Sequence, residues 1–355
     1  MTTTVTTQQA LPTYQNEQAW YGPEMTRRTD WTHTFTPQEV EEIDAAVAQA
    51  EATGKDILEI GIKDFSLPHL SKVLLKARKE TLLGRGFQLL RGVPVERYTL
   101  RQSAIAYWGI GLYFGDPVSQ NAKGHVLGHV ANLGLNYDDP EVRGYQTSAR
   151  LRYHTDFGDL VALLCLRTAK SGGLSSIVSS TTVWNELVRR RPDCARTLMN
   201  QFYYTRWGEI SKGELPFWTI PIFSPYDGRM LSTYIPQGIL KAQALPGVPE
   251  LTDEQKEAMA ELDKLTADPS LYFDMEFKPG DIQVLSNYST YHSRTAYEDW
   301  PEIKNRRHLL RLWFASPDGP ALPQVMYDRF GTLPNGRPDG IRVAGVSLVA
   351  PLDPQ

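Results

Sequence analysis

The stretch "LRYHTDFGDLVALLCLR", residues 151–167, places a histidine and an aspartate two positions apart, directly before a strongly apolar run. In a β-strand, residues i and i+2 point to the same face of the sheet, so His154 and Asp156 can direct their side chains into one cavity. An imidazole and a carboxylate together suit a divalent metal such as Fe(II). A single His-x-Asp pair occurs often by chance, so the rest of the chain must supply a third ligand before a metal site is predicted.

The chain contains seven histidines, and the best third ligand among them is His292, in the segment "FKPGDIQVLSNYSTYH" (277–292). The Pro-Gly-Asp turn at 279–281 predicts the start of a strand, and we expect this strand to carry His292 about ten residues later. His125 and His129 lie in a glycine-flanked segment, either as solvent-facing turn residues or at the mouth of a site. The sequence therefore favours His154, Asp156 and His292 as a metal-binding triad.

The segment "RRHLLRLWFA", residues 306–315, carries two arginines four positions apart. In a strand, Arg307 and Arg311 share one face, while His308 points to the opposite face. An arginine on a largely apolar strand is costly to bury unless it meets an anion, and its planar guanidinium matches a carboxylate with two parallel hydrogen bonds. Two interpretations remain open for each arginine: it binds an anionic ligand, or it forms a buried ion pair with Asp or Glu.

Composition and charge exclude several classes of function. The 355 residues carry a net charge of -4 without a clustered basic excess, so nothing indicates a nucleic-acid partner. The two cysteines, Cys165 and Cys194, form neither a disulfide framework nor a Cys-x-x-Cys metal motif. The N-terminus lacks the basic and apolar regions of a signal peptide, and no apolar run is long enough to cross a membrane. We therefore expect a cytoplasmic protein without a membrane partner.

The pattern along the chain predicts one mainly β domain with flanking helices. Residues 1–18 are expected to form a flexible N-terminal tail, residues 19–320 the single domain with helical inserts, and residues 321–355 a C-terminal extension that wraps the surface. Short apolar segments between turn residues predict strands over 86–95, 159–167, 174–180, 219–224, 229–235, 271–277, 281–287 and 308–316. Periodicity and capping residues predict helices over 36–54, 70–83, 99–113, 181–192 and 252–268.

Four motifs, in order, resemble a known enzyme family. His154-x-Asp156 is followed by "SGGLSSIVSS" (171–180), by the Pro-Gly-Asp turn with His292, and by "RRHLLRLWF" (306–314). This order is similar to the taurine dioxygenase/TfdA-like branch of the Fe(II)- and 2-oxoglutarate-dependent dioxygenases, over roughly residues 80 to 315. The resemblance implies a double-stranded β-helix (jelly-roll, cupin-like) core, and it implies that His154, Asp156 and His292 hold the iron.

The resemblance also implies roles for polar residues around the iron. Arg307 corresponds to the arginine that binds the far carboxylate of 2-oxoglutarate, and Arg311 to a second arginine that contacts the substrate or the same co-substrate. Ser175 stands where the family often has a threonine whose hydroxyl binds that carboxylate, and a plain strand serine is the alternative. Gln120 and Asn121 lie in a segment similar to one that approaches the active site in relatives, so they are candidates to hydrogen-bond the substrate.

The activity that the resemblance implies is oxidation of a small organic molecule, in secondary metabolism or catabolism, with O2 and 2-oxoglutarate consumed and succinate and CO2 released. Related halogenases replace the carboxylate ligand with a small residue, so Asp156 favours hydroxylation, desaturation or a related C–H oxidation. Segment 201–223 mixes aromatic and polar residues and forms either a lid or two core strands. Two alternative functions remain: a non-catalytic jelly-roll binding protein, and a jelly-roll metalloenzyme that does not use 2-oxoglutarate. A homo-oligomer is compatible with the sequence.

Overall fold

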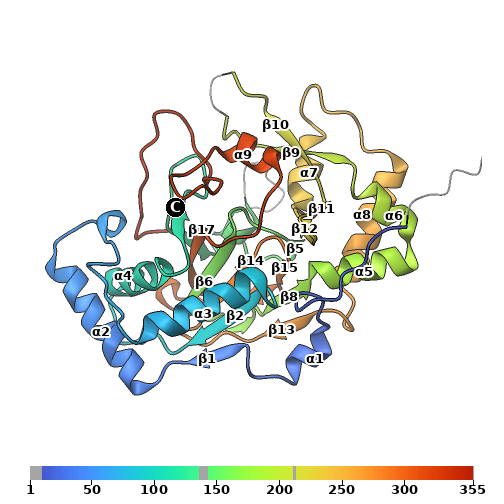
Figure 1. Ribbon diagram of the computed structural model, residues 1–355. Coiled ribbons are helices and arrows are strands. Elements are labelled where there is room, and N and C mark those ends of the chain that lie inside the picture. The colour runs from blue at the N-terminus through green and yellow to red at the C-terminus, as the bar shows by residue number, and fades with distance from the viewer. Residues whose placement is uncertain (1–9, 136–142, 211–212, 355) are drawn as a thin grey trace, which may run out of the picture.

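Two larger β-sheets with helices on either side form the protein in the computed structural model, which describes residues 10–135, 143–210 and 213–354 (Figure 1). Within these ranges the larger sheet has seven strands in the order β1-β2-β14-β6-β17-β3, and β4 also pairs with β17. β1 is parallel to β2, and the other pairs of this sheet are antiparallel. Its strands are β1 (Thr32–Thr34), β2 (Phe87–Arg91), β3 (Asp116–Val118), β4 (Gly128–Ala131), β6 (Leu160–Arg167), β14 (Ile282–Ser286) and β17 (His308–Ala315).

The smaller sheet has the order β13-β8-β15-β5, and its neighbouring strands are antiparallel. Its strands are β5 (Leu151–His154), β8 (Ser175–Ser179), β13 (Phe273–Met275) and β15 (Thr290–Arg294). Three short antiparallel pairs form separate two-stranded sheets: β7 (Ser171–Gly172) with β16 (Tyr297–Glu298), β9 (Gln201–Thr205) with β10 (Phe217–Pro221), and β11 (Phe223–Tyr226) with β12 (Arg229–Ser232). The predicted strand 219–224 is thus divided between β10 and β11.

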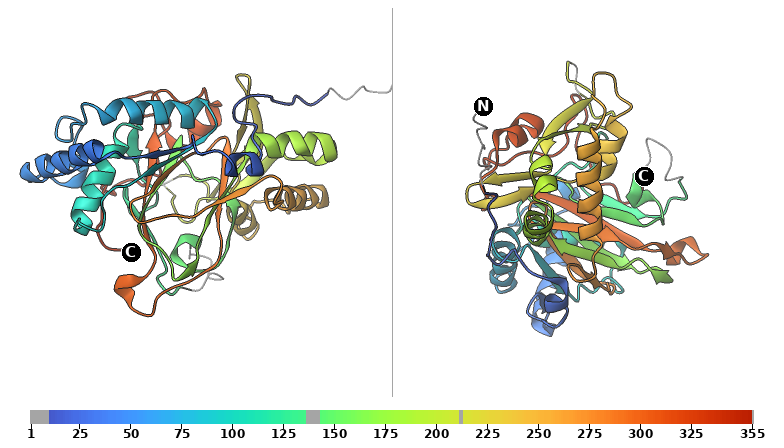
Figure 2. Two further views of the ribbon diagram at one scale, coloured as in Figure 1. Left: turned by 90° about the horizontal axis from the view of Figure 1, so that it is seen from below. Right: turned by 90° about the vertical axis from the view of Figure 1, so that its right-hand side faces the viewer.

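Two groups of helices lie on opposite sides of the strands (Figure 2). The first group packs its apolar faces on the larger sheet and comprises α2 (Pro37–Ala52), α3 (Leu70–Leu83) and α4 (Leu100–Gly111). The second packs beside the smaller sheet and comprises α5 (Ser180–Arg190), α6 (Pro192–Thr197) and α8 (Asp253–Thr266). The remaining helices are short: α1 (Gly22–Thr26), α7 (Pro236–Ala242), α9 (Gln324–Phe330) and the 3-10 turns Ile57–Glu59, Gly144–Gln146 and Ile303–Asn305.

Capping residues explain where the predicted long helices begin. The side chains of Thr36, Thr99 and Thr252 each accept a hydrogen bond from the backbone N–H three residues later. The side chain at that later position accepts a hydrogen bond from the backbone N–H of the capping threonine. Such a capping box satisfies two of the N–H groups that a helix start leaves free. In the described residues, none of these helices is both long and apolar enough to cross a membrane.

β17 shows how strand alternation separates core from cavity. Leu310, Leu312 and Phe314 pack into the layer between the larger sheet and helices α2–α4. The alternate residues Leu309, Arg311 and Trp313 line a pocket between the two larger sheets. Every residue of this strand is buried, so the period of two, rather than exposure, determines which side chains reach the pocket.

The strand predicted over 281–287 is β14, but the expectation that this strand continues to His292 is wrong. The chain forms β14 in the larger sheet and a separate strand, β15, in the smaller one. Residues 287–289, Asn-Tyr-Ser, make the turn between them. Asn and Ser favour turns because their side chains bond to nearby backbone groups. His292 therefore lies in the sheet that also carries His154, which the single-strand prediction did not provide.

Both terminal segments contact the body of the protein. Of the predicted N-terminal tail, residues 1–9 lie outside the described ranges. Residues 10–18 lie against α5, where the backbone N–H of Tyr14 donates to Asn185 Oδ1 at 2.9 Å and Trp184 Nε1 donates to the carbonyl oxygen of Pro12 at 2.8 Å. Near the C-terminus, Val349 forms a parallel bridge with His125.

Candidate metal centre and active site

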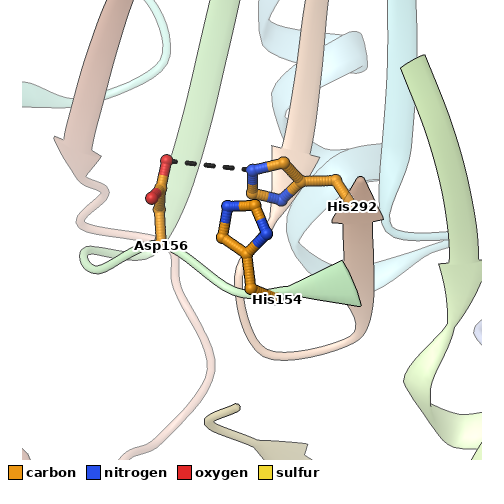
Figure 3. Close-up of side chains that lie close together, drawn as sticks. All are labelled: His154, Asp156 and His292. Atoms are coloured by element: carbon orange, nitrogen blue, oxygen red, sulfur yellow. Dashed lines mark ion pairs between the residues drawn. The ribbon is translucent and has the colours of Figure 1, made fainter. Parts of the chain in front are cut away.

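Three possible metal ligands meet at one edge of the smaller sheet (Figure 3). His154 is the last residue of β5, and His292 on β15 is its partner in the register of the two strands. Asp156 follows β5 by two residues, and its Oδ2 lies 3.9 Å from Nε2 of His292. One ligand atom from each of the three residues lies within 4.8 Å of the others. The structure therefore brings together the three residues that the sequence singled out.

Both histidines are held in the neutral form, which is the form that binds metal ions. Burial lowers the pKa of His154; burial, with the nearby His154, lowers the pKa of His292 to about 3. Nδ1 of His154 donates a hydrogen bond to the carbonyl oxygen of Arg152 at 2.7 Å. A carbonyl oxygen only accepts, so the proton is on Nδ1 and the lone pair of Nε2 is left for a ligand.

Asp156 is kept ionised and fixed in direction by its neighbours. Burial opposes its ionisation, but Arg311 and the indole N–H of Trp313 hold its pKa below the ordinary value. Nη1 of Arg311 lies 3.2 Å from Oδ2, and Nε1 of Trp313 donates to the same oxygen at 3.0 Å. The backbone N–H of Asp156 donates to Oδ1 of Asn287 at 3.1 Å. Arg311 thus forms the buried ion pair that was one of the two interpretations of the arginines.

The pocket extends from the triad between the sheets, and Arg307 and Ser175 both line it. Arg307 is 4% exposed, and within the described part of the chain its Nη1 has no hydrogen-bond partner and its guanidinium no ion pair. Burial lowers its pKa, because the charged form is poorly solvated there. Ser175 Oγ donates to Gln283 Oε1 at 2.9 Å. The walls beside them are apolar and comprise Val130, Leu163, Phe277 and Leu309.

Gln120 and Asn121, predicted to contact the substrate, do not line this pocket. Gln120 is 1% exposed, and its Oε1 accepts from Nε of Arg311 at 2.7 Å while its Nε2 donates to the carbonyl oxygen of Val126 at 2.7 Å. Oδ1 of Asn121 accepts from the backbone N–H of Lys123 at 3.0 Å and stabilises a turn. Gln120 holds Arg311 in place, and the geometry gives neither residue a direct contact with a ligand.

Segment 201–223 consists mainly of the core strands β9 and β10, with buried side chains of Phe202, Tyr204, Trp218 and Ile220. Residues 211–212 lie outside the described ranges. Trp207, in the connection between the strands, lines the pocket and has a positive φ of 47°. The Cζ of Arg143 lies 5.2 Å from its ring centroid, and Gly238 approaches its ring so closely that a Cβ there would lie 2.7 Å away. The connection thus contributes one aromatic wall to the pocket.

The histidines outside the triad lie away from the pocket. Nδ1 of His129 and Nε2 of His308 are 2.8 Å apart, and Nε2 of His129 lies 2.9 Å from the carbonyl oxygen of Pro351. Nη2 of Arg167 lies 3.1 Å from Nδ1 of His308. Arginine only donates and a carbonyl oxygen only accepts, so every hydrogen bond in this chain runs from donor to acceptor in the same direction. Each histidine therefore donates with one ring nitrogen and accepts with the other, which makes both of them neutral. His308 faces away from Arg307 and Arg311, as strand alternation predicted.

Sequence reasoning missed two further pocket residues, Arg294 and Tyr145. Arg294 lies two positions after His292 on β15, so strand alternation places it on the same face, and this signal was available in the sequence. The ring centroid of Tyr145 lies 4.7 Å from Cζ of Arg311. Tyr145 precedes β5 in a short 3-10 turn, and no local pattern indicated that it reaches the pocket.

Residues 49–313 match the family described as "Taurine catabolism dioxygenase TauD, TfdA family". The chain belongs to this family. It is 28% identical over 311 residues to FR-33289 synthase of Streptomyces rubellomurinus (strain ATCC 31215), covering 86% of this chain and 91% of that protein. It is 31% identical over 310 residues to taurine hydroxylase-like protein SAT17 of Stachybotrys chartarum (strain CBS 109288 / IBT 7711), covering 84% of this chain and 78% of that protein.

Solved structures share the fold at low sequence identity. Asparagine oxygenase in complex with Fe(II), 2S,3S-3-hydroxyasparagine and succinate has a TM-score of 0.64 and 16% identity, covering 87% of this chain and 99% of that chain. The non-heme iron oxygenase OrfP in complex with Fe, succinate and (3S)-hydroxy-L-Arg has a TM-score of 0.61 and 14% identity, with the same shares covered. The architecture of mixed sheets and flanking helices is therefore that of Fe(II)- and 2-oxoglutarate-dependent oxygenases.

Proposed function

We propose that His154, Asp156 and His292 bind Fe(II) and that Arg307, with Ser175, binds the far carboxylate of 2-oxoglutarate in the pocket between the sheets. As a member of its family, the protein is an Fe(II)- and 2-oxoglutarate-dependent dioxygenase that oxidises a small organic substrate with release of succinate and CO2. The observation that carries the assignment is the meeting of the triad with a buried arginine whose Nη1 has no hydrogen-bond partner and whose guanidinium forms no ion pair in the described residues.

The donor set fits Fe(II). Two neutral imidazoles and one carboxylate form the ligand set of non-heme iron oxygenases and leave open positions for other ligands. The His154 tautomer presents Nε2, and Asp156 is ionised without needing a bound cation. The rejected alternative, a metalloenzyme without 2-oxoglutarate, gives Arg307 no anion, and a buried charge without an anion is costly.

Bound Fe(II) and 2-oxoglutarate supply the oxidising power of the reaction, with O2 as the oxidant. The residues of this chain bind and orient the iron, the co-substrate and the substrate, and they exclude water from the site. Arg311 and Trp313 fix the direction of the Asp156 carboxylate, and Gln120 in turn fixes Arg311. The apolar walls keep water from the co-substrate, which strengthens the interaction of Arg307 with a carboxylate.

The substrate is proposed to lie against the aromatic and apolar residues at the other side of the triad. These pocket residues are Phe157, Trp207, Ile235 and Pro236, with Arg143 and Arg152 beside them. The mixture suits a small or medium organic molecule with an apolar part. Names of relatives, such as the synthase and the taurine hydroxylase-like protein, support a C–H oxidation in secondary metabolism, by hydroxylation, desaturation or a related step.

The finer architecture also belongs to this proposal. We propose that the seven-stranded and four-stranded sheets face each other as a double-stranded β-helix, in one domain over residues 19–320 that the 321–355 extension wraps. The position of the triad and the pocket between the two sheets supports this arrangement of the sheets. Two buried free cysteines support a reducing, cytoplasmic location. Analytical ultracentrifugation tests whether several copies assemble.

Anaerobic addition of Fe(II) and 2-oxoglutarate to the full-length protein tests the function. We expect a visible absorption band from chelation of the 2-oxo acid, and succinate after exposure to air. His154→Ala should abolish both. Lack of the band together with lack of succinate in the wild-type protein would contradict the proposal.

A further inference from the structure

Arg294 is a buried arginine beside the proposed co-substrate site that has no role in the proposal above. It lies on β15 two residues after His292, about 7 Å along the strand and on the same face. It is 4% exposed and lines the pocket. The register of β15 with β8 places it opposite Ser175, which lines the same pocket. Arg294 and Ser175 therefore lie together, about 7 Å along the strand from the proposed iron ligand His292.

Arg307 reaches the same place from the larger sheet. Its Cζ lies 5.2 Å from the ring centroid of Tyr297, and Cζ of Arg294 lies 4.7 Å from the same centroid. Nη2 of Arg294 also donates to the carbonyl oxygen of Ala149, which fixes the direction of its guanidinium. Gly173 leaves room for Arg307, because a Cβ at this position would lie 3.1 Å from Nε of Arg307. Two guanidinium groups, one from β15 and one from the residue directly before β17, are thus held beside one aromatic ring.

We propose that Arg294 and Arg307 together bind the far carboxylate of 2-oxoglutarate, an inference that rests on the proposed function. An ionised carboxylate has about four acceptor positions, enough for two guanidinium groups and a hydroxyl. Two like charges beside one ring repel each other, and an anion in contact with both offsets that repulsion. Arg294 is therefore a binding residue for the co-substrate and makes the site more selective for a dicarboxylate than Arg307 alone.

The test compares two ligands that differ at the far end. 2-Oxopentanoate carries the same 2-oxo acid group as 2-oxoglutarate but ends in a methyl group. Anaerobic titration of the Fe(II)-loaded, full-length protein, followed by the chelation band and by calorimetry, gives a dissociation constant for each. For Arg294→Gln we expect the constant for 2-oxoglutarate to rise about 10- to 100-fold, as for loss of a charged hydrogen bond, with the constant for 2-oxopentanoate unchanged.

Two matched variants control the experiment. Arg294→Lys keeps the positive charge but loses the planar pair of donors, so it should retain part of the preference for 2-oxoglutarate. Lys304→Gln removes one positive charge from an exposed position near β17 and should leave both constants unchanged. If Arg294→Gln does not fold, Arg294→Lys takes its place, and a reduced preference for 2-oxoglutarate is then the expected result.

The outcomes separate this inference from the proposed function. Equal weakening of both ligands means that Arg294 only supports the fold of the pocket, and an unchanged preference in the folded variant means that it does not contact the carboxylate; either result overturns the inference. A wild-type protein that binds neither ligand overturns the proposed function instead.

Discussion

The buried ion pair between Asp159 and Arg337 anchors the turn that follows Asp156, one of the three proposed metal ligands. Asp159 is 1% and Arg337 6% exposed, and Nε of Arg337 donates to Oδ2 of Asp159 at 3.0 Å. The same oxygen accepts from the backbone N–H of Ser316 at 2.7 Å. Replacing Arg337 with leucine leaves a buried carboxylate with only part of its hydrogen bonds. Removal of one partner of such a pair costs about 3–5 kcal/mol of stability, so we expect Arg337→Leu to lower the free energy of unfolding by this amount.

The loss of stability in Arg337→Leu should become smaller at lower pH. Burial raises the pKa of Asp159 even with Arg337 present, and without the arginine the neutral acid is favoured further. A carboxyl group whose pKa is higher in the folded than in the unfolded state takes up its proton first in the folded state. The stability deficit of Arg337→Leu should therefore shrink as the pH falls from about 7 toward 4. Adding Asp159→Asn, which removes the buried charge, should recover part of the stability at neutral pH.

Urea unfolding followed by tryptophan fluorescence measures the effect, with iron retention as a second readout. The backbone N–H of Asn287 donates to the carbonyl oxygen of Asp159 at 3.1 Å, and Asn287 also holds the backbone of Asp156, so iron should be retained less well. The control is Arg342→Leu, which breaks the more exposed pair with Asp339 and should cost about 0–1 kcal/mol. A deficit for Arg337→Leu no larger than that of the control, or one that grows at acid pH, would refute the reasoning.

Three further predictions concern the site and the histidine pair. His154→Ala and Asp156→Ala should abolish iron retention and turnover, measured by metal analysis and succinate formation, whereas His125→Ala, outside the pocket, should keep both. Arg307→Ala should raise the 2-oxoglutarate requirement about 10- to 100-fold, while Arg311→Ala should mainly weaken iron retention; the reverse pattern would exchange their roles. Burial, with His129 and Arg167, lowers the pKa of His308 to about 3 from 6.5, so the unfolded chain binds a proton there that the folded protein does not. Stability should fall as the pH drops below about 6.5, by up to about 1.4 kcal/mol per pH unit, and His308→Gln should flatten this slope in urea unfolding.

Local pattern was sufficient for the five long helices and for the strands that were predicted, but it did not indicate the short helices α1, α6, α7 and α9 or the strands β1, β3 and β4. α3 begins and ends at the predicted residues, 70 and 83, and the capping threonines mark the starts of α2, α4 and α8. Local pattern failed where the chain changes sheets, between β14 and β15. Alternation and turn propensity describe a strand and its end, but they do not say which sheet the next strand joins.

The same division applies to the site. The meeting of His154, Asp156 and His292 could be predicted, because His154 and Asp156 lie two positions apart at the end of one strand and His292 completes a known order of motifs. Gln120 could not be placed, because its role depends on Arg311, which is 191 residues away in the sequence. Trp207 reaches the pocket through a backbone conformation with positive φ that is uncommon for a residue other than glycine, and no sequence pattern indicates it.

Arg307, directly before β17, and Arg311, within it, show why a motif alone left their roles open. Four residues along a strand span about 13 Å, so Arg307 and Arg311 meet different surroundings although they share one face. Arg311 lies at the metal end, where Asp156 neutralises its charge and Gln120 holds its Nε. Arg307 lies beside Tyr297, and its guanidinium forms no ion pair in the described residues, so an anion that binds there would pair with its charge. In the proposed function, 2-oxoglutarate would lie between the two positions, with its 2-oxo acid end toward the triad and its far carboxylate toward Arg307. Under this proposal, the spacing that looked like one repeated signal in the sequence corresponds to the two ends of a single co-substrate site.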